Sequence, residues 1–254
     1  DGDVKQYGAS PSPLGEVLKN EFSQVIKRCR IENEDVVIKY KDDKVFYEKI
    51  RMVDADFLEM FTFPLKWGSP ESLQQPSSVI LSEQNAEKYI DDKNPIGETL
   101  QITFKNNEKR SFEVTGVAKE FPGASSFRFN FLINLENLKV SNPDIDLNDW
   151  GGFVNSTFIQ LANASEIQSI ENQMEQYVKL QNSMNDKWKA ISFSFLPLST
   201  LHKKSGNIRS GISGNGFMIL YNSFITFVFI GFFVVVLAAS NYINIAIVSA
   251  SKRL

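Results

Sequence analysis

The chain has 254 residues, with 27 Lys and Arg, 30 Asp and Glu, one His, one Cys and a net charge of −3. This balance excludes the strong positive charge typical of nucleic-acid binding, and a single cysteine excludes an intrachain disulfide. After Arg209 the only charged residues are Lys252 and Arg253. A charged region is therefore followed by an apolar tail, which excludes a fully soluble enzyme and a multi-spanning transporter core.

Short segments in which apolar and polar residues alternate, or in which apolar residues run together, predict strands. In chain order these are Val4–Ala9, Val36–Tyr40, Lys44–Val53, Val79–Leu81, Thr99–Phe104, Ser111–Ala118, Phe127–Ile133, Val154–Leu161 and Ile191–Leu196. In the segment 127–133, we expect the three Phe residues at 127, 129 and 131 to share one face.

Helical spacing of apolar residues, combined with capping residues, predicts the helices. They are a helix over 12–30 that begins at Ser12-Pro13, a short helix capped by Asp54 that ends at Phe61, a helix from Ser82 to Ile90, and a helix begun by a capping box of Ser165 and Gln168. The last helix is expected to bury one face, consisting of Ile167, Ile170, Met174, Tyr177 and Val178.

These elements predict an α+β architecture. The strand 154–161, the helix after it and the strand 191–196 form a βαβ unit. The helix 12–30 and its strands form a second, similar unit if Val4–Ala9 is a strand. We therefore expect residues 1–61 and 153–210 to form an α/β subdomain, with residues 62–152 as a β-rich inserted subdomain.

Residues 217–248 are the predicted transmembrane helix. A bilayer core requires about 20 apolar residues, a length that Ile219–Ala239 meets. Small and polar residues in this helix predict a face that packs against other membrane helices. They are Asn222, Thr226, Gly231, Asn241 and Asn244. The alternative is that those near the ends lie in the polar head groups.

The residues that flank the apolar segment predict its orientation. Lys252 and Arg253 follow it directly, which indicates a cytoplasmic C-terminal side, where a cytoplasmic coupling segment would begin. Residues 1–210 are then extracytoplasmic, although Lys203, Lys204 and Arg209 weaken this orientation. The linker 199–216 is rich in glycine. We expect part of it to pack on the domain, or the membrane helix to begin before residue 217, with Ile208, Ile212 and Phe217 as the contacts. The alternative is a flexible tether.

The sequence predicts no catalytic residue, cofactor or metal site. The single histidine, His202, stands beside two lysines in the linker, which disfavours a Ser-His-Asp triad. A phosphate-binding P-loop motif is absent from the sequence. The acidic run 144–149 lacks the Gly and Glu that a calcium loop needs, so it is interpreted as a polar surface loop.

Four segments resemble a known family in their order along the chain. VDADFLEMFTFPLKWG (Val53–Gly68) resembles the V-x-x-x-F-x-x-x-F-x-x-x-L-x-x-G signature of the MacB-like periplasmic core domain. SVILSEQNAEKYI (Ser78–Ile90), NPIGETLQI (Asn94–Ile102) and FEVTGVAKEFP (Phe112–Pro122) follow in that family's order. The apolar segment ending NYINIAIVSASKRL (Asn241–Leu254) resembles the second transmembrane helix of FtsX-like ABC-transporter permeases.

This resemblance implies a bacterial inner-membrane permease of four helices, with a large periplasmic domain between helices one and two. Its implied partners are a cytoplasmic ABC ATPase, separate or fused, a second permease copy or paralogue, the lipid bilayer, and in some cases a periplasmic protein. Such permeases transmit ATP-driven motion across the membrane. On this reading the chain is a fragment that lacks the other helices and the ATPase.

Two other hypotheses compete with the permease. A single-pass membrane-anchored binding or sensor protein would have the same apolar helix but no further spans. A membrane-anchored hydrolase would need a nucleophile and a base, which the sequence does not offer.

Overall fold

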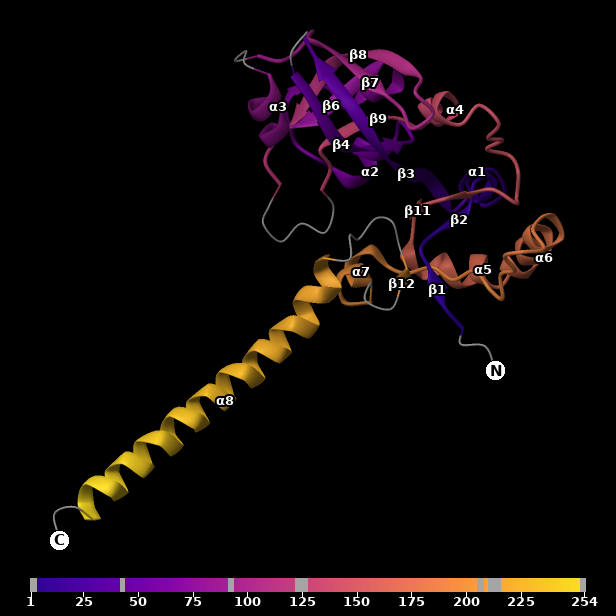
Figure 1. Cartoon of the computed structure of the whole chain (residues 1–254). Coiled ribbons are helices and arrows are strands. Elements are labelled where there is room, and N and C mark those ends of the chain that lie inside the picture. The colour runs from indigo at the N-terminus through magenta and orange to yellow at the C-terminus, as the bar shows by residue number, and fades with distance from the viewer. Residues whose placement is uncertain are drawn as a thin grey trace. The chain divides into compact units, whose positions relative to one another are not determined.

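The computed structural model describes residues 4–41, 44–90, 94–121, 128–204, 208–209 and 216–251. The chain consists of two compact units, Asp1–Ile212 and Ser213–Leu254. The second contains a single long helix, α8 (Gly216–Ser251), drawn in yellow in Figure 1. The first unit mixes helices and strands, which confirms the α+β class.

The elements of the first unit are short, apart from one long strand. Its strands are β1 (Gln6–Tyr7), β2 (Ser10–Pro11), β3 (Val25–Tyr40), β4 (Lys44–Val53), β5 (Leu65–Gly68), β6 (Ser78–Ser82), β7 (Thr99–Thr103), β8 (Lys109–Ala118), β9 (Phe131–Asn134), β10 (Phe153–Val154), β11 (Ser156–Leu161) and β12 (Ile208–Arg209). Its helices are α1 (Leu14–Glu21), α2 (Phe57–Phe61), α3 (Glu83–Tyr89), α4 (Leu138–Ser141), α5 (Ile167–Glu171), α6 (Met174–Met184) and α7 (Leu198–Lys204), with 3-10 turns η1 (Pro70–Gln74), η2 (Leu135–Asn137) and η3 (Ala164–Glu166).

Six strands form a closed barrel. Around the ring, β3 pairs with β4, β4 with β9, β9 with β6, β6 with β8, β8 with β7, and β7 with β3 again. The β4–β9 and β6–β8 pairs are parallel, and the others are antiparallel. Since a small barrel has no room for water, side chains from every strand must fill its interior.

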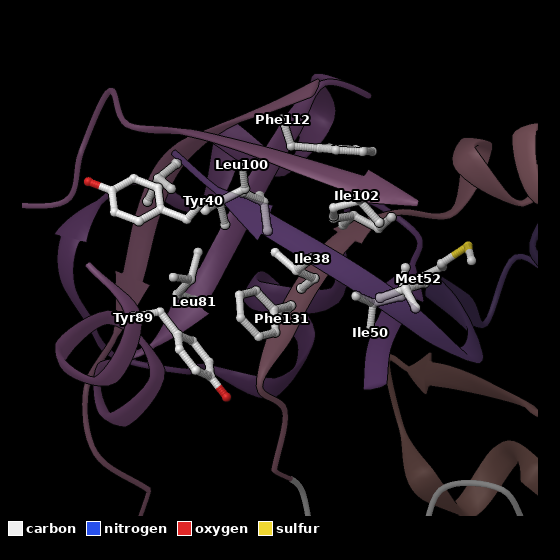
Figure 2. Packing of buried hydrophobic residues seen from close by; sticks show 14 of the residues in the cluster. Ile38, Tyr40, Ile50, Met52, Leu81, Tyr89, Leu100, Ile102, Phe112 and Phe131 are labelled. Atoms are coloured by element: carbon white, nitrogen blue, oxygen red, sulfur yellow. The ribbon is translucent and has the colours of Figure 1, made fainter. Parts of the chain in front are cut away.

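The interior of this barrel is the largest apolar core of the unit, here called the barrel core. It includes Val36, Ile38, Tyr40, Ile50, Met52, Val79, Leu81, Tyr89, Leu100, Ile102, Phe112, Val114, Phe131 and Ile133. Figure 2 shows Ile38, Leu81 and Phe131, which come from three different strands, pointing toward one another. Burying each such side chain contributes roughly 1.5–3 kcal/mol, so the barrel core is a major source of stability.

A second apolar group, here called the aromatic cluster, covers the outer side of several barrel strands. It consists of Cys29, Ile31, Val53, Phe57, Leu58, Leu73, Ile80, Ala118, Phe129 and Leu132. Strand alternation explains the division. Val79 and Leu81 face the barrel core, while Ile80 between them faces the aromatic cluster. The strand β6 is thus buried on both sides.

The helices α1, α5 and α6 contribute most of a third apolar group, the helical cluster. It brings Leu14, Leu18 and Phe22 from the α1 region together with Val25, Ile170, Met174 and Tyr177. The ring of Trp150 stacks on that of Tyr177, with centroids 5.7 Å apart. The predicted apolar face of the helix after residue 165 is confirmed for Ile170, Met174, Tyr177 and Val178, which are all buried, while Ile167 is half-buried.

Several local predictions are confirmed. The strands at 44–53, 79–81, 99–104 and 111–118 occur within a residue or two of their expected bounds. The Ser82 hydroxyl caps α3 as expected, because its oxygen accepts a hydrogen bond from the Asn85 backbone N–H at 3.3 Å.

The predicted helix over 12–30 is wrong in its second half. The helix α1 ends at Glu21, and β3 begins at Val25. The apolar spacing of Phe22, Val25 and Cys29 fits a helix, but strand pairing prevails. β-branched residues favour strands, and β3 pairs with β11 along most of the stretch from Val25 to Ile31.

Two predicted caps are also wrong. Asp54 does not cap α2, since its carboxylate binds Arg30 and α2 begins at Phe57. The capping box of Ser165 and Gln168 is replaced by Asn163, whose side-chain oxygen accepts a hydrogen bond from the Ser165 N–H at 3.1 Å. At the first place Arg30 occupies the carboxylate that would form the cap, and at the second another polar side chain, Asn163, caps the turn.

Three predicted strands differ from the structure. Residues 191–196 form no strand, so the predicted βαβ unit of 154–161, the following helix and 191–196 is wrong. Phe193 and Phe195 instead pack on the helical cluster, and side-chain packing satisfies their alternation without a ladder. Val4–Ala9 contributes only the two-residue β1. The strand expected from Phe127 begins at Phe131, and Phe127 lies outside the described residues. Phe129 faces the aromatic cluster and Phe131 the barrel core, so they do not share a face.

The barrel combines both segments of the predicted domain division. Its strands β3 and β4 come from residues 1–61, and β6, β7, β8 and β9 come from residues 62–152. Residue 62 is therefore not a boundary of the barrel. Whether 1–61 with 153–210 and 62–152 behave as separate subdomains remains a prediction.

Candidate functional site

The second unit is a helix of membrane-spanning length. Of its 36 residues, the 25 from Ile225 to Ser249 have a mean hydropathy of 2.1 and are not buried against any other part of the described chain. At 1.5 Å per residue they rise about 37 Å, more than the roughly 30 Å of a bilayer core. Within the described residues, α8 is the one helix that is long and apolar enough to cross a membrane.

The predicted helix-packing residues occupy different sides of α8. Thr226 and Asn244 are 18 residues apart, about five turns, so they lie on the same face. Asn222 is one turn from Thr226, and its side chain lies outside the described part of the structure. Asn241 flanks this face, and Gly231 lies on the opposite side, two and a half turns from Asn222.

Exposure is consistent with these positions contacting lipid or other helices. The side chains of Thr226, Asn241 and Asn244 are exposed, and a Cβ added at Gly231 would meet nothing within 4 Å. Lys252 and Arg253, the predicted start of the cytoplasmic coupling segment, lie outside the described residues. The role of all these residues in helix packing or coupling remains a prediction.

The chain just before α8 is attached to the first unit at two points. On α7, Leu201 packs against the aromatic cluster. Further on, β12 pairs in parallel with β1, where Ile208 lies opposite Gln6 and the Gly8 N–H donates to the Arg209 carbonyl at 2.9 Å. These described parts of the predicted linker are therefore not free coil.

A buried ionic group connects α1 with two strands of the barrel. The Arg30 guanidinium donates to both Asp54 carboxylate oxygens at 3.0 Å, and the Arg30 N–H donates to one of them at 2.7 Å. Arg28 forms a further ion pair with Asp54, and its Nε donates to Glu16 on α1 at 2.8 Å. The group joins α1, β3 and the end of β4.

Electrostatics favour the charged forms of this group. Burial by itself would raise the pKa of the Asp54 carboxyl, but the hydrogen bonds and charges of Arg30 and Arg28 outweigh it and hold that pKa below its ordinary value. Arg30 and Asp54 are 9% and 8% exposed. A buried pair of this kind is costly to break, because removing one partner leaves an uncompensated charge.

The ionic group was missed by the sequence analysis. The available signal was the alternation of Arg28 and Arg30 with Cys29 and Ile31, a strand pattern that the helical interpretation of 12–30 concealed. Leu201 was also missed as an individual contact, although packing of part of its segment on the domain was expected.

A second polar group lies on the outer side of the β3–β4 pair. The Arg51 Nε donates to the Asn33 side-chain oxygen at 3.1 Å. Among the described residues, the Arg51 Nη1 has no hydrogen-bond partner. Burial lowers the pKa of Arg51 to about 10, because a desolvated guanidinium is less stable in its charged form.

The described residues contain no group of three or more His, Cys, Asp or Glu side chains placed to hold a metal ion. The single cysteine, Cys29, is fully buried. Burial, together with the nearby Asp54 charge, raises the pKa of its thiol well above the ordinary value, so it packs as a small apolar residue.

The comparisons with known proteins agree with this architecture. The profile of the MacB-like periplasmic core domain matches residues 5–177. A domain of a protein described as a permease from Porphyromonas gingivalis superposes with a TM-score of 0.58 at 16% identity, covering 78% of this chain and 87% of that one. No match was found among curated proteins.

Two transporter domains have the same fold. The extracellular domain of the noncanonic ABC-type transporter YknZ from Gram-positive bacteria gives a TM-score of 0.51 at 16% identity, covering 69% of this chain and 84% of that one. The periplasmic region of MacB from Actinobacillus actinomycetemcomitans gives a TM-score of 0.52 at 15% identity, covering 80% of this chain and 85% of that one.

These findings identify the class of protein to which the chain belongs, in which an extracytoplasmic α+β domain is joined to an apolar helix. The chain belongs to the family of the MacB-like periplasmic core domain, whose profile covers more than half of it. It is a component of a transporter permease of the inner membrane, with an extracytoplasmic segment. In this family the permease works in general with a cytoplasmic ATPase.

Proposed function

We propose that this chain couples cytoplasmic ATP hydrolysis to the export or release of a substrate on the extracytoplasmic side, without carrying out covalent chemistry itself. In this role α8 moves with the ATPase, and the periplasmic domain follows that motion. Lys252 and Arg253 begin the segment that receives it. A second permease copy or paralogue packs on the face of α8 that contains Thr226 and Asn244.

The observation that carries this proposal is the attachment of the segment before α8. A glycine-rich segment in free coil transmits force poorly, because its end-to-end distance fluctuates. Here Leu201 packs on the aromatic cluster and β12 pairs with β1. Arg209 at the end of β12 lies seven residues before Gly216, and Leu201 lies fifteen residues before it, so a displacement of α8 acts first on the β1–β12 pair and then on α7.

The test compares two leucines of α7 in the intact transporter. Leu201 packs on the aromatic cluster, whereas Leu198 on the same helix is 50% exposed. We expect Leu201→Ser to reduce stimulation of the partner ATPase by substrate while membrane insertion stays normal, and Leu198→Ser to have little effect. Equal stimulation in the two variants would contradict the coupling role of α7.

A longer linker provides the second test. A short Gly-Ser insertion after Gly211 is expected to lower stimulation and transport, because it separates α8 from the attached segment. The same insertion after Asn107, in the exposed turn between β7 and β8, serves as the matched control. Unchanged transport with the Gly211 insertion would favour a single-pass anchored binding or sensor protein instead.

A further inference from the structure

Exposed aromatic, apolar and cationic side chains occur at the end of α6, on the loop that follows it and on the neighbouring β1–β12 pair. This group, called the Trp188 patch, consists of Tyr7, Met184, Lys187, Trp188, Ile191 and Arg209. Ile191 is 75% exposed, Met184 61% and Trp188 42%. Single exposed apolar residues are ordinary, but a group of large ones rimmed by cations indicates an interaction surface.

Hydrogen bonds hold the loop that presents the patch. The Gln181 side-chain amide donates to the Trp188 carbonyl at 2.5 Å, and the Trp188 N–H donates to the Asn185 side-chain oxygen at 2.9 Å. Asn182 bonds both the N–H and the carbonyl of Ala190, at 2.7 and 2.8 Å. The exposed side chains therefore extend from a fixed backbone.

Ring contacts connect this loop to the segment that leads to the membrane helix. The Trp188 ring lies edge-on to that of Tyr7 at 4.6 Å and to that of Phe153 at 5.0 Å. The Arg209 guanidinium lies 5.9 Å from the Tyr7 ring centroid, and Arg209 pairs with Tyr7 in the β1–β12 ladder. The patch is thus continuous with β12.

The length of chain after β12 indicates what covers the patch. Only residues 210–215 separate Arg209 from Gly216, where α8 begins. At about 3.5 Å per extended residue, this chain reaches at most about 25 Å. Within this reach of a membrane helix, the bilayer is a large apolar partner that can cover the patch.

We propose that the Trp188 patch rests in the membrane–water interface and contacts phospholipid head groups and the upper acyl chains. Its composition matches that layer. Trp and Tyr prefer the interface because their rings are apolar at one end and polar at the other. Lys187 and Arg209 attract anionic head groups, and Met184 and Ile191 supply apolar area. Contact with lipid goes beyond the coupling function and does not depend on it.

Fluorescence quenching of the full chain in lipid vesicles tests this inference. The chain has three tryptophans, and none is in α8. In the double variant Trp67→Phe/Trp150→Phe, Trp188 is the one remaining tryptophan, so all tryptophan fluorescence comes from the patch. In vesicles of phosphatidylethanolamine and phosphatidylglycerol, shallow brominated lipids are expected to quench its emission, because an interfacial Trp lies at the depth of the bromine atoms. The matched variant that retains only Trp67, which packs against the barrel core, is expected to keep its emission.

A labelled cysteine provides a second measurement if the tryptophan variants do not fold. Ile191→Cys changes an exposed residue, and the native Cys29 is buried and does not label. A nitroxide at position 191 should show the depth-dependent collisions of an interfacial site. Tyr47→Cys, at a position 87% exposed on β4, is expected to behave as fully aqueous.

Specific outcomes would overturn the inference. If Trp188 is quenched no more than Trp67, and the label at 191 is as aqueous as that at 47, the patch does not contact lipid. If the label at 191 is shielded only as protein density in the vesicles rises, a second copy covers the patch instead. Replacing phosphatidylglycerol with phosphatidylcholine should weaken the quenching of Trp188, because Lys187 and Arg209 lose their anionic partners.

Discussion

Replacing Asp54 with alanine is expected to be among the most destabilising changes to a charged residue in this chain. The variant removes three hydrogen bonds from Arg30, at 2.7, 3.0 and 3.0 Å, and the ion pair with Arg28. Among the described residues, the partner that remains for the Arg30 guanidinium is the Ser12 carbonyl, at 3.2 Å. Removing one partner of a buried ion pair costs about 3–5 kcal/mol.

The assay is thermal unfolding of the full chain in detergent, followed by near-UV circular dichroism. For a domain of this size each kcal/mol lowers the midpoint by about 2–4 °C, so Asp54→Ala should lower it by about 6–20 °C. The control is Asp35→Ala, which removes an exposed pair with Lys49 at 3.8 Å and should cost under about 0.5 kcal/mol. Similar shifts for the two variants would refute the reasoning.

A double substitution distinguishes the cost of the lost Asp54 hydrogen bonds from the cost of leaving the Arg30 charge buried without a partner. Arg30→Met combined with Asp54→Leu removes both buried charges, while Arg28 keeps Glu16 as its partner. If the cost of Asp54→Ala arises from the uncompensated Arg30 charge, the double variant should be more stable than the single one.

The same group predicts a pH dependence. The folded-state pKa of Asp54 lies below its ordinary value, so the folded chain binds this proton less readily than the unfolded chain. The stabilisation is therefore fully present at neutral pH, declines as pH falls below about 4, and is lost once pH passes below the folded-state pKa. In the variant Asp54→Asn, the midpoint of thermal unfolding should therefore fall less steeply below about pH 4 than in the unchanged protein.

Three further changes have expected outcomes in the same assay. Gly68→Ala should cost about 3 kcal/mol or more, because φ is +84° and the new Cβ would lie 2.1 Å from the Thr115 carbonyl oxygen; Gly97→Ala, at φ +89° with nothing within 4 Å, should cost only about 1 kcal/mol. Arg51→Met should leave the midpoint unchanged or raise it, since a buried guanidinium with an unpartnered Nη1 is replaced by an apolar chain; a fall of several degrees would show that the bond from Arg51 to Asn33 outweighs the cost of burying the guanidinium. Ser82→Ala should cost about 1 kcal/mol through the lost α3 cap, and no change would mean that the cap is dispensable.

The helices and strands that were predicted correctly have a sequence pattern that fits only one type of secondary structure. Thr99–Thr103 and Lys109–Ala118 alternate around a polar turn, and α3 has both a cap and a short apolar face. Local chemistry determines such elements, so the sequence alone is sufficient. The apolar helix was identified for the same reason, because no soluble element has its composition.

The errors occur where non-local pairing decides between two acceptable patterns. Val25 and Cys29 fit a helix as well as a strand, and the choice depends on β11, far along the chain. The barrel itself was not foreseen, because closure of the ring depends on which strands pair. Likewise, the role of Asp54 depends on Arg30 lying beside it in space. The helix-packing positions of α8 remain a prediction, since partner helices decide them.

The barrel combines strands that lie far apart in the chain, and this has a consequence for the order in which they fold. The β3–β4 hairpin is local and forms early, but its ring neighbours β9 and β7 lie further along the chain. Contacts between distant residues form slowly, because loop closure costs entropy before any contact repays it. As the chain emerges, Ile38 and Ile50 therefore remain accessible to water until Phe131 arrives. During this interval the protein is most exposed to aggregation and to proteases, and the span from β4 to β9 determines how long the interval lasts.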